Sequence, residues 1–448
     1  MKISPFWWHD LGSENTLEIT PAPLPEQADV VVVGAGFTGL AAALTFVRHG
    51  RSVVVLDRGQ PGLGASTRNG GICSGNLRVK HAVLKERHGL EHANRIYAEA
   101  VDAREDLRQF IETENIDCSL KNSGWLLGAM SQAHYEMLSR EAEALNAIAG
   151  HDIEMLPRDQ VTAEINSPRF YGGMLRREID SFHPARFFAG LLDIARREGV
   201  VICPDRTVMS IDDDDTGKAR GKAGSKAGGK IVRLAEGSIR AGKVMVATNG
   251  YTGRQHAFSQ FVRQRLVPVQ SAIIVTEKLG HERVSAMFPG MRSSSTTAHL
   301  SAYFRPTPDG ERILLGSRSF DRVQPSRRTV FYLKRLLADL FPQLRDVGID
   351  YCWLGNVAFT RTQLPAIFTR DDITYSCGYA GSGTVWARWL GRKAAEECLG
   401  MTNNPSVFSG PPPETIPFYD GDPWFMPLVS GYYASRDIVN EWRFGNRS

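Results

Sequence analysis

Apolar residues near the start of the chain occur in two short runs on either side of a helical segment. Residues 30–33 are four valines, and residues 52–56, SVVVL, form a second apolar run that ends at Asp57. Between them, residues 39–49, GLAAALTFVRH, read as a helix that ends at Gly50. Two apolar runs flanking a helix predict a β-α-β unit with buried parallel strands.

The rest of the chain alternates between helical and strand-like spacing. Segments rich in Glu, Arg, Ala and Leu predict a mostly helical insertion. Alternating residues on either side of PTPDGE, a turn signal, predict an antiparallel sheet. The predicted helices are 82–117, 133–149, 185–198, a segment near 326–341 and a last helix opened by GYAGSG. The predicted strands are 121–129, 200–209, 239–248, 264–277, 301–318 and 373–377.

Residues 212–230, between two of these strands, contain almost no apolar side chain. They read DDDDTGKARGKAGSKAGGK, which predicts a solvated loop or a hairpin tip. The basic half is a candidate contact for RNA or another anionic surface, although a solvated charge run is the more common structure. We find no internal repeats, and we expect two domains, each assembled from separated segments.

Composition excludes several classes of protein. The 448 residues include 53 basic and 49 acidic side chains, a net charge of +4 that does not suggest a nucleic-acid binder. The six cysteines are scattered with no CxxC pair, so we expect no zinc site, no other metal and no disulfide framework. The first fifteen residues lack the apolar stretch of a signal peptide, and the three glycines in residues 30–47 argue against a membrane span. We therefore expect a cytoplasmic protein with no membrane or nucleic-acid partner.

Residues 34–39 read GAGFTG, a GxGxxG motif in a favourable context. The motif follows the valine strand and opens the helix, and Asp57 stands at the end of the next strand. In this pattern Gly34 makes the tight turn, Gly36 lets a pyrophosphate approach the backbone and Gly39 lets the helix pack on the strand. The helix N-terminus attracts phosphate, and Asp57 can accept hydrogen bonds from ribose hydroxyls. An ordinary glycine turn in an α/β domain is the alternative.

A second glycine-rich segment begins seven residues after Asp57. Residues 64–76, GASTRNGGICSGN, contain four glycines, three hydroxyl side chains and one arginine. Such a loop can lay backbone N–H groups along a large flat ligand, which favours FAD over NAD. Ser66, Thr67, Arg68 and Asn69 would supply donors for phosphate and ring oxygens.

With GAGFTG, Asp57, GASTRNGG and the C-terminal GYAGSG, the chain resembles the D-amino-acid oxidase superfamily of flavoproteins. The resemblance extends from PFWWHD at 5–10 to PWFMPLVSGYY at 423–433 and is strongest to the γ-glutamylputrescine oxidase branch. It implies an α/β fold in which a Rossmann-like FAD-binding domain is interleaved with an α+β substrate domain built on an antiparallel sheet. We assign residues 1–82, 186–252 and 365–448 to the first domain, and 83–185 and 253–364 to the second.

The resemblance also implies where FAD binds. Residues 64–71 would wrap the flavin, the 208 and 247–249 regions would lie near the adenosine and pyrophosphate, and the helix opened by 381–384 would face the pyrimidine end of the flavin. Residues 354–365 lack the cysteine to which some relatives attach flavin, so we expect non-covalent FAD, with Cys73 as the one nearby thiol. The predicted cofactor-binding residues are Gly34, Ala35, Gly36, Phe37, Thr38, Gly39, Asp57, Arg58, Gly64, Ala65, Ser66, Thr67, Arg68, Asn69, Gly70, Gly71, Val208, Ala247, Thr248, Asn249, Gly381, Ser382, Gly383 and Thr384.

Superfamily members oxidise carbon–nitrogen bonds, so the resemblance implies a small-molecule amine substrate. A neutral amine would reduce the flavin, and the imine would be hydrolysed to an aldehyde or oxo acid. Only one dinucleotide motif is present, so the electron acceptor is expected to be dioxygen or a redox partner.

Candidate catalytic residues are His183, Tyr303, Arg305 and Lys278. Tyr303 and Arg305 lie two apart and share a sheet face, where Arg305 would hold a carboxylate or would instead be a salt-bridged surface residue. By resemblance, His183 would lie near the cofactor and Lys278 would activate oxygen, while a structural histidine is the alternative for His183.

Several other side chains are weaker candidates for the substrate site. The side chains Trp125, Trp353 and Tyr379 are candidate aromatic walls or core residues. Arg361 stands where many relatives carry an acidic residue, which favours an amine that also bears an anionic group.

Two other functions stay open. A tRNA-modifying flavoprotein would use residues 218–230 to contact RNA, and small-amine turnover that survives deletion of 214–229 would exclude it. A flavin-binding subunit that passes electrons within a complex is the second. The isolated subunit would not react with any amine, and size exclusion would show its assembly.

Overall fold

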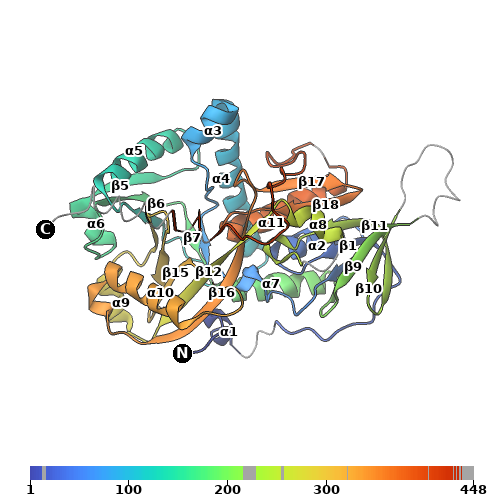
Figure 1. The fold of residues 1–448 in the computed structure, drawn as a ribbon, viewed down its shortest axis with the longest axis horizontal. Helices are drawn as coiled ribbons and strands as arrows, with labels where there is room; N and C mark the ends of the chain where they lie inside the picture. Colours follow the sequence, from blue (N-terminus) through green and yellow to red (C-terminus); the bar gives the residue numbers. More distant parts are fainter. Residues whose placement is uncertain are drawn as a thin grey trace.

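Two eight-stranded sheets organise the protein (Figure 1). The computed structural model describes residues 1–12, 17–214, 229–253, 257–319, 321–401, 403–426, 428–429, 431–432 and 435. The helices are α1 (Phe6–His9), α2 (Phe37–Arg48), α3 (His81–His88), α4 (Leu90–Thr113), α5 (Gln132–Asn146), α6 (Arg158–Glu164), α7 (Pro184–Arg197), α8 (Ala257–Arg263), α9 (His281–Met287), α10 (Arg327–Leu340) and α11 (Gly383–Cys398).

The first sheet contains the predicted β-α-β unit at its centre. Its strand order is β17-β18-β11-β1-β2-β8, with β9 and β10 added beside β11 as an antiparallel hairpin. The five strands β8, β2, β1, β11 and β18 are parallel, which fits the all-apolar run at Val30–Val33. The strands are β1 (Gln27–Val33), β2 (Val53–Leu56), β8 (Val201–Cys203), β9 (Val208–Asp213), β10 (Lys230–Leu234), β11 (Gly237–Val246), β17 (Ala366–Arg370) and β18 (Ile373–Cys377).

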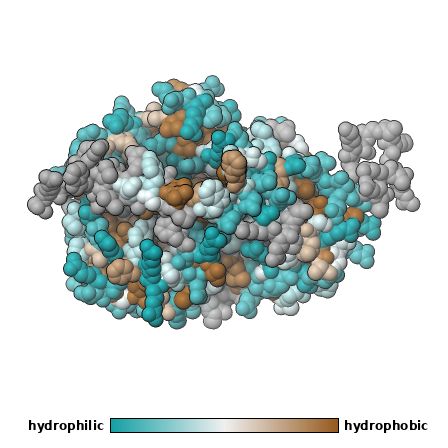
Figure 2. All heavy atoms as spheres, viewed as in Figure 1, coloured by the Kyte–Doolittle hydropathy of each residue, from teal (hydrophilic) through white to brown (hydrophobic). Residues whose placement is uncertain are grey.

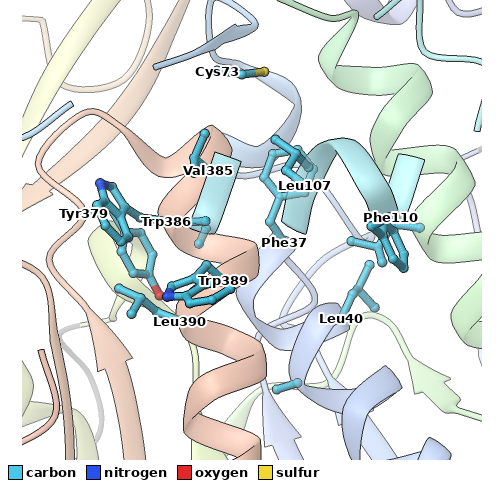
Figure 3. Close-up of a cluster of buried hydrophobic side chains, with 14 of the residues drawn as sticks. Phe37, Leu40, Cys73, Leu107, Phe110, Tyr379, Val385, Trp386, Trp389 and Leu390 are labelled. Carbon is cyan, nitrogen blue, oxygen red and sulfur yellow. The ribbon is translucent and has the colours of Figure 1, made fainter. Parts of the chain in front are cut away.

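Helices α2 and α11 pack closely over this sheet. A Cβ at Gly391 would lie 2.4 Å from the backbone oxygen of Thr38, so only glycine allows the two helices to approach this far. Figure 3 shows the buried cluster that holds α2, α11 and α4 together. Its labelled side chains are Phe37, Leu40, Cys73, Leu107, Phe110, Tyr379, Val385, Trp386, Trp389 and Leu390.

The second sheet has the order β16-β12-β15-β14-β13-β4-β6-β5 and is antiparallel except between β13 and β4. The predicted hairpin around PTPDGE is confirmed as β14 and β15. A separate hydrophobic core lies against this sheet and includes Phe288, Phe304 and Phe341. The strands are β4 (Trp125–Gly128), β5 (Ile153–Pro157), β6 (Gly172–Arg176), β12 (Val267–Thr276), β13 (Ser293–Thr296), β14 (Tyr303–Pro306), β15 (Ile313–Arg318) and β16 (Ile349–Phe359).

Two small contacts join the sheets near the glycine-rich loop. Strand β3 (Ile72–Cys73), which lies within the glycine-rich segment 64–76, pairs with β7 (Asp180–Ser181). The N-terminal helix α1 packs with α7 and with residues of the second sheet, in a cluster that includes Trp7, Leu314 and Trp353. The strands of each sheet fall within the segments assigned to one domain, and the domain boundaries themselves stay a prediction.

Most predicted elements form, with shifts that have local causes. The helix predicted over 82–117 is two helices because the chain turns at Gly89, where φ is +83°. The strand predicted over 200–209 is likewise β8 and the start of β9, separated by a turn at Asp205 with φ +56°. Of the predicted 212–230 loop, residues 215–228 lie outside the described residues, and the flanking β9 and β10 are the arms of a hairpin.

The face of the protein in Figure 2 is mainly hydrophilic. On the face in Figure 2, hydrophobic side chains form small groups among polar ones. Within the described residues, no helix combines the length and apolar composition that crossing a bilayer requires.

Candidate active site

The turn between β1 and α2 requires its glycines for different physical reasons. Gly34 has φ +108°, and a Cβ there would lie 2.9 Å from the oxygen of Ala247, the residue after the neighbouring strand β11. A Cβ at Gly39 would lie 1.8 Å from the oxygen of Gly34, so this glycine is required for the helix to pack on the turn. Gly36 instead borders a cavity, and the nearest atom to its Cβ position is Ser66 Oγ at 3.0 Å.

Asp57 connects the ends of β1 and β2. Its carboxylate accepts hydrogen bonds from the backbone N–H groups of Ala35 (2.8 Å) and Gly59 (3.1 Å). Burial raises the pKa of Asp57, and these two N–H groups oppose that shift because they favour the charged form. The carboxylate thus fixes the glycine turn, and it borders the same cavity as Gly36.

This first cavity has a volume of about 710 Å³. It gathers residues from the β1–α2 turn, the glycine-rich loop, the end of β11 and the start of α11, as the sequence predicted. The predicted cofactor residues that border it are Gly34, Gly36, Phe37, Thr38, Asp57, Arg58, Gly64, Ala65, Ser66, Asn69, Val208, Ala247, Thr248, Asn249, Gly381, Gly383 and Thr384. The predicted residues that do not border it are Ala35, Gly39, Thr67, Arg68, Gly70, Gly71 and Ser382.

Sequence reasoning missed several residues of this wall. They include Gln60, Arg206, Tyr251, Asn356 and Ala380. Tyr251 lies two residues after the predicted Asn249, and its hydroxyl accepts a hydrogen bond from the Asn356 N–H at 3.1 Å. Ala380 lies inside the GYAGSG motif, so its position was the one signal available for it.

The 64–71 loop is held by donors from distant segments. The indole of Trp7 donates to the Asn69 oxygen (2.8 Å), and that of Trp353 donates to the Arg68 oxygen (2.9 Å). Trp8 donates through its indole to Thr67 Oγ1 at 2.8 Å. The loop conformation is therefore fixed by the N-terminal segment and by β16.

Polar side chains within the loop are also occupied by the protein. Asn69 donates to the oxygens of Ala65 and Ser66 and accepts from the Gly71 N–H. Arg68 donates to the oxygens of Leu63 (2.7 Å) and Leu354 (3.1 Å). Thr67 and Arg68 thus stabilise the loop, in contrast to their predicted use as donors to the cofactor.

A second cavity, of about 410 Å³, adjoins the first. It lies between the 64–71 loop, the second sheet and α5, and Trp125 and Tyr303 are among its aromatic walls. The residues that border both cavities are Ala65, Asn69, Asn356, Val357, Ala380, Gly381 and Thr384. A ligand in the first cavity would therefore meet a ligand in the second at this shared wall.

The N-terminus of α11 lies in the shared wall. Thr384 Oγ1 donates to the Ile72 oxygen (2.6 Å), and Ser382 Oγ donates to the Asn76 oxygen (2.5 Å). Tyr379, just before the helix, shares a 2.8 Å hydrogen bond with Thr38 of α2. Both helix N-termini, of α2 and α11, thus point their positive dipole ends toward the first cavity.

Of the four predicted catalytic residues, only Tyr303 borders one of these two cavities. Its hydroxyl shares a 3.1 Å hydrogen bond with Ser271 Oγ, and burial raises its pKa to about 12. Arg305 is buried and donates to the backbone oxygens of Gly71 and Phe182, both at 3.1 Å. It supports the 64–71 loop and borders neither cavity, so it is not placed to hold a substrate carboxylate.

His183 and Lys278 also lie outside both cavities. His183 is fully buried and caps α7, accepting from the Arg186 N–H at 3.1 Å, while its Nε2 lies 3.4 Å from a carboxylate oxygen of Asp10. Burial lowers the pKa of His183, although Asp10 opposes the shift. Lys278 is 66% exposed and pairs with Glu311 at 2.5 Å, so the structure does not bring it together with Tyr303.

The remaining candidate residues lie in different places relative to the two cavities. Trp353 is buried below the loop, whereas Tyr379 borders the first cavity. Arg361 is 56% exposed and pairs with Glu414 at 2.6 Å, so it borders neither cavity and does not support an anionic substrate. None of the six cysteines, all of which the structure describes, borders either cavity.

Comparison with known proteins places this geometry in context. The family described as "FAD dependent oxidoreductase" (DAO) matches residues 29–397. The chain is 29% identical over 413 residues to the γ-glutamylputrescine oxidoreductase of Escherichia coli (strain K12), covering 91% of this chain and 92% of that protein. It is 27% identical over 449 residues to the probable oxidoreductase OrdL of Rhizobium meliloti (strain 1021), covering 97% and 98%. Among solved structures, glycine oxidase from Geobacillus kaustophilus has a similar fold, with a TM-score of 0.69 at 17% identity over 88% of this chain and 99% of that chain.

Proposed function

Because the chain belongs to the DAO family of FAD-dependent oxidoreductases, we propose that it oxidises a carbon–nitrogen bond in a small primary or secondary amine. The amine loses two electrons and two protons to become an imine, and water then hydrolyses the imine to an aldehyde or oxo acid and releases ammonia or a smaller amine. FAD supplies the two-electron acceptor for this oxidation. The observation that most supports the proposal is the shared wall between a cavity built on the dinucleotide motif and a second, adjoining cavity.

The residues of the first cavity fit a flavin dinucleotide. Gly36 leaves the backbone open to the cavity at the N-terminus of α2, where a pyrophosphate would be stabilised. Each carboxylate oxygen of Asp57 accepts one backbone N–H, which leaves spare acceptor capacity for ribose hydroxyls. The N-terminus of α11 would stabilise negative charge on the flavin ring.

We further propose that FAD is bound without a covalent link, because no cysteine borders either cavity. Acid precipitation of the purified protein tests this proposal. Yellow flavin in the supernatant and a colourless pellet are expected. Flavin that stays with the pellet after washing in denaturant would contradict it.

The second cavity would hold the amine and exclude water from it. Its wall combines Trp125, Leu127, Met137, Leu138 and Met174 with polar groups on the second sheet. An ammonium ion has no lone pair to release, and an apolar enclosure lowers the pKa of a bound amine. The cavity thus favours the neutral amine that the oxidation requires.

Anaerobic reduction of the bound flavin tests the proposed function. The purified holoprotein is mixed with one amine at a time, including γ-glutamylputrescine, sarcosine and glycine, and the flavin absorbance near its visible maximum is followed. Bleaching by at least one amine is expected, and fast recovery in air with hydrogen peroxide formation would identify dioxygen as the acceptor. A flavoprotein that no amine of the panel bleaches would contradict the proposal.

A further inference from the structure

Helix α10 has one face in the protein core and one face in solvent. The helix packs on β12 and β15 of the second sheet. Its buried side chains are Thr329, Leu333, Leu337 and Leu340, which recur at helical spacing. Phe331 lies on the opposite side of the helix and is 70% exposed. A ring of this size in water loses free energy that burial against an apolar partner would recover.

Cations surround Phe331 on this solvent face. Residues three and four positions apart are neighbours on a helix surface. For Phe331 these four neighbours are Arg327, Arg328, Lys334 and Arg335. The three arginines are exposed, and the lysine is half-buried. The one acidic residue of α10, Asp339, lies a turn further along and pairs with Arg169 at 3.0 Å.

The four cations around Phe331 have no counter-charge in the part of the chain that the structure describes. None of them forms an ion pair with a described carboxylate. The whole chain has a net charge of only +4, so this face concentrates positive charge that is nearly balanced over the protein as a whole. A partner with negative charge at the level of the cations and apolar volume beneath would match both the cations and the ring.

The apolar part of this face is too small for a stable protein interface. Among the described residues of 321–341, the exposed large apolar side chains are Phe331 and Val323, which is 92% exposed. A specific protein interface buries about 800 Å² on each partner around an apolar core. A nucleic acid would pair with the cations but would leave the aliphatic Val323 in water. A lipid surface offers phosphate groups above an acyl boundary, so it matches both kinds of side chain.

We propose that the solvent face of α10 binds the surface of a bilayer that contains anionic lipids. The four cations lie at the level of the headgroup phosphates, and Phe331 enters the boundary with the acyl chains. The contact is peripheral, because the other face of α10 stays in the protein core. It revises the sequence-based expectation of no membrane partner, and it is independent of the proposed amine oxidation.

Sedimentation with lipid vesicles tests the proposal. The purified holoprotein is mixed with vesicles of phosphatidylcholine alone and with vesicles that also contain about 30% phosphatidylglycerol, an anionic lipid. Each cation near an anionic surface contributes about fivefold to the partition coefficient, so we expect binding to the anionic vesicles to be stronger by about 100-fold or more. Raising the salt concentration should weaken this binding, because the Debye length shortens.

Matched variants locate the binding surface. The double substitution Arg327→Gln with Arg328→Gln should lower the partition coefficient for anionic vesicles by about 25-fold. The control, Lys85→Gln with Arg87→Gln, removes two exposed cations from α3, on another side of the molecule (Figure 1), and should change it by less than about threefold. Phe331→Ser keeps every charge and should lower it by about tenfold. Urea unfolding checks that each variant stays folded.

Three results would overturn the inference. The first is equal binding, or none, to the two kinds of vesicle. The second is an equal loss in the α10 and α3 double variants, which would assign the attraction to net charge instead of to α10. The third is binding of single-stranded RNA that the α10 double variant loses, without binding to anionic vesicles, which would assign this face to a nucleic acid. None of these measurements uses amine turnover, so the proposed function is tested separately.

Discussion

Replacing Trp7 by phenylalanine tests whether the N-terminal segment shapes the FAD site. Trp7 lies before residue 29, where the family match begins, yet its indole donates to Asn69 in the 64–71 loop. The side chain is fully buried, with its ring 5.4 Å from that of Phe6 and 4.9 Å from that of His183. Phenylalanine would keep an aromatic ring in this place and remove the donor.

The loss of free energy follows from the indole donor and from the ring volume that the substitution removes. Leaving the backbone oxygen of Asn69 without its indole donor costs about 1–3 kcal/mol. The smaller ring leaves a void that costs roughly 1 kcal/mol more. If about 2 kcal/mol of this falls on the loop conformation that binds FAD, the dissociation constant rises roughly 30-fold. Fluorescence titration of the apoprotein with FAD measures this change.

Trp8→Phe is the matched control. It removes an indole donor one residue later, but Trp8 is only half-buried, and its partner Thr67 keeps its own 2.6 Å hydrogen bond to the Gly62 oxygen. We expect a loss of about 1 kcal/mol or less, or about fivefold in the dissociation constant. FAD binding by Trp7→Phe within about threefold of the parent would refute the claim that the N-terminal segment supports the FAD site.

Three further predictions concern single residues. Gly39→Ala should destabilise the protein by about 4 kcal/mol or more and abolish FAD binding, because the new Cβ would overlap the Gly34 oxygen. Urea unfolding and flavin content measure the two effects, and a stable, yellow variant would contradict the packing of Gly39 against Gly34. His183→Asn keeps a helix-capping acceptor and removes a group whose pKa is lower in the folded state than when unfolded. The unfolding free energy of the parent should therefore fall more steeply than that of this variant below about pH 6.5, by up to about 1.4 kcal/mol per pH unit. Equal pH slopes for the two proteins would contradict a lowered pKa of His183 in the folded state. Arg361→Ala should leave the Michaelis constant of the best substrate unchanged, because Arg361 pairs with Glu414 on the surface, and a several-fold rise would return it to the substrate site.

Local sequence signals were sufficient for the dinucleotide half of the site. The β1–α2–β2 unit, the roles of Gly34 and Gly39 and the position of Asp57 depend on contacts between neighbouring elements, so their spacing is visible in the sequence. The start of α11 was also predictable from GYAGSG. Short polar strands could not be predicted from such signals. Strand β13, Ser293–Thr296, shows no apolar alternation.

The substrate half depends on contacts between distant segments. Arg305 reaches a loop more than 230 residues earlier in the chain, so nothing near it in sequence indicates that backbone oxygens occupy its guanidinium. Arg78 belongs to no motif, and only the fold shows that it borders the second cavity. Gly70 and Gly71 were predicted to bind the cofactor, but a Cβ there would meet Tyr303 and the Phe182 oxygen, so packing requires glycine at both positions.

A crystal structure of the holoprotein with an unreactive amine analogue tests the central claim, that a flavin and an amine meet at the wall between the two cavities. We predict that the flavin ring contacts Ala65, Asn69 and Gly381 in this wall and that the analogue occupies the second cavity, with its nitrogen-bearing carbon against the ring. A flavin ring that lies away from this wall, or an analogue bound outside the second cavity, would contradict the account.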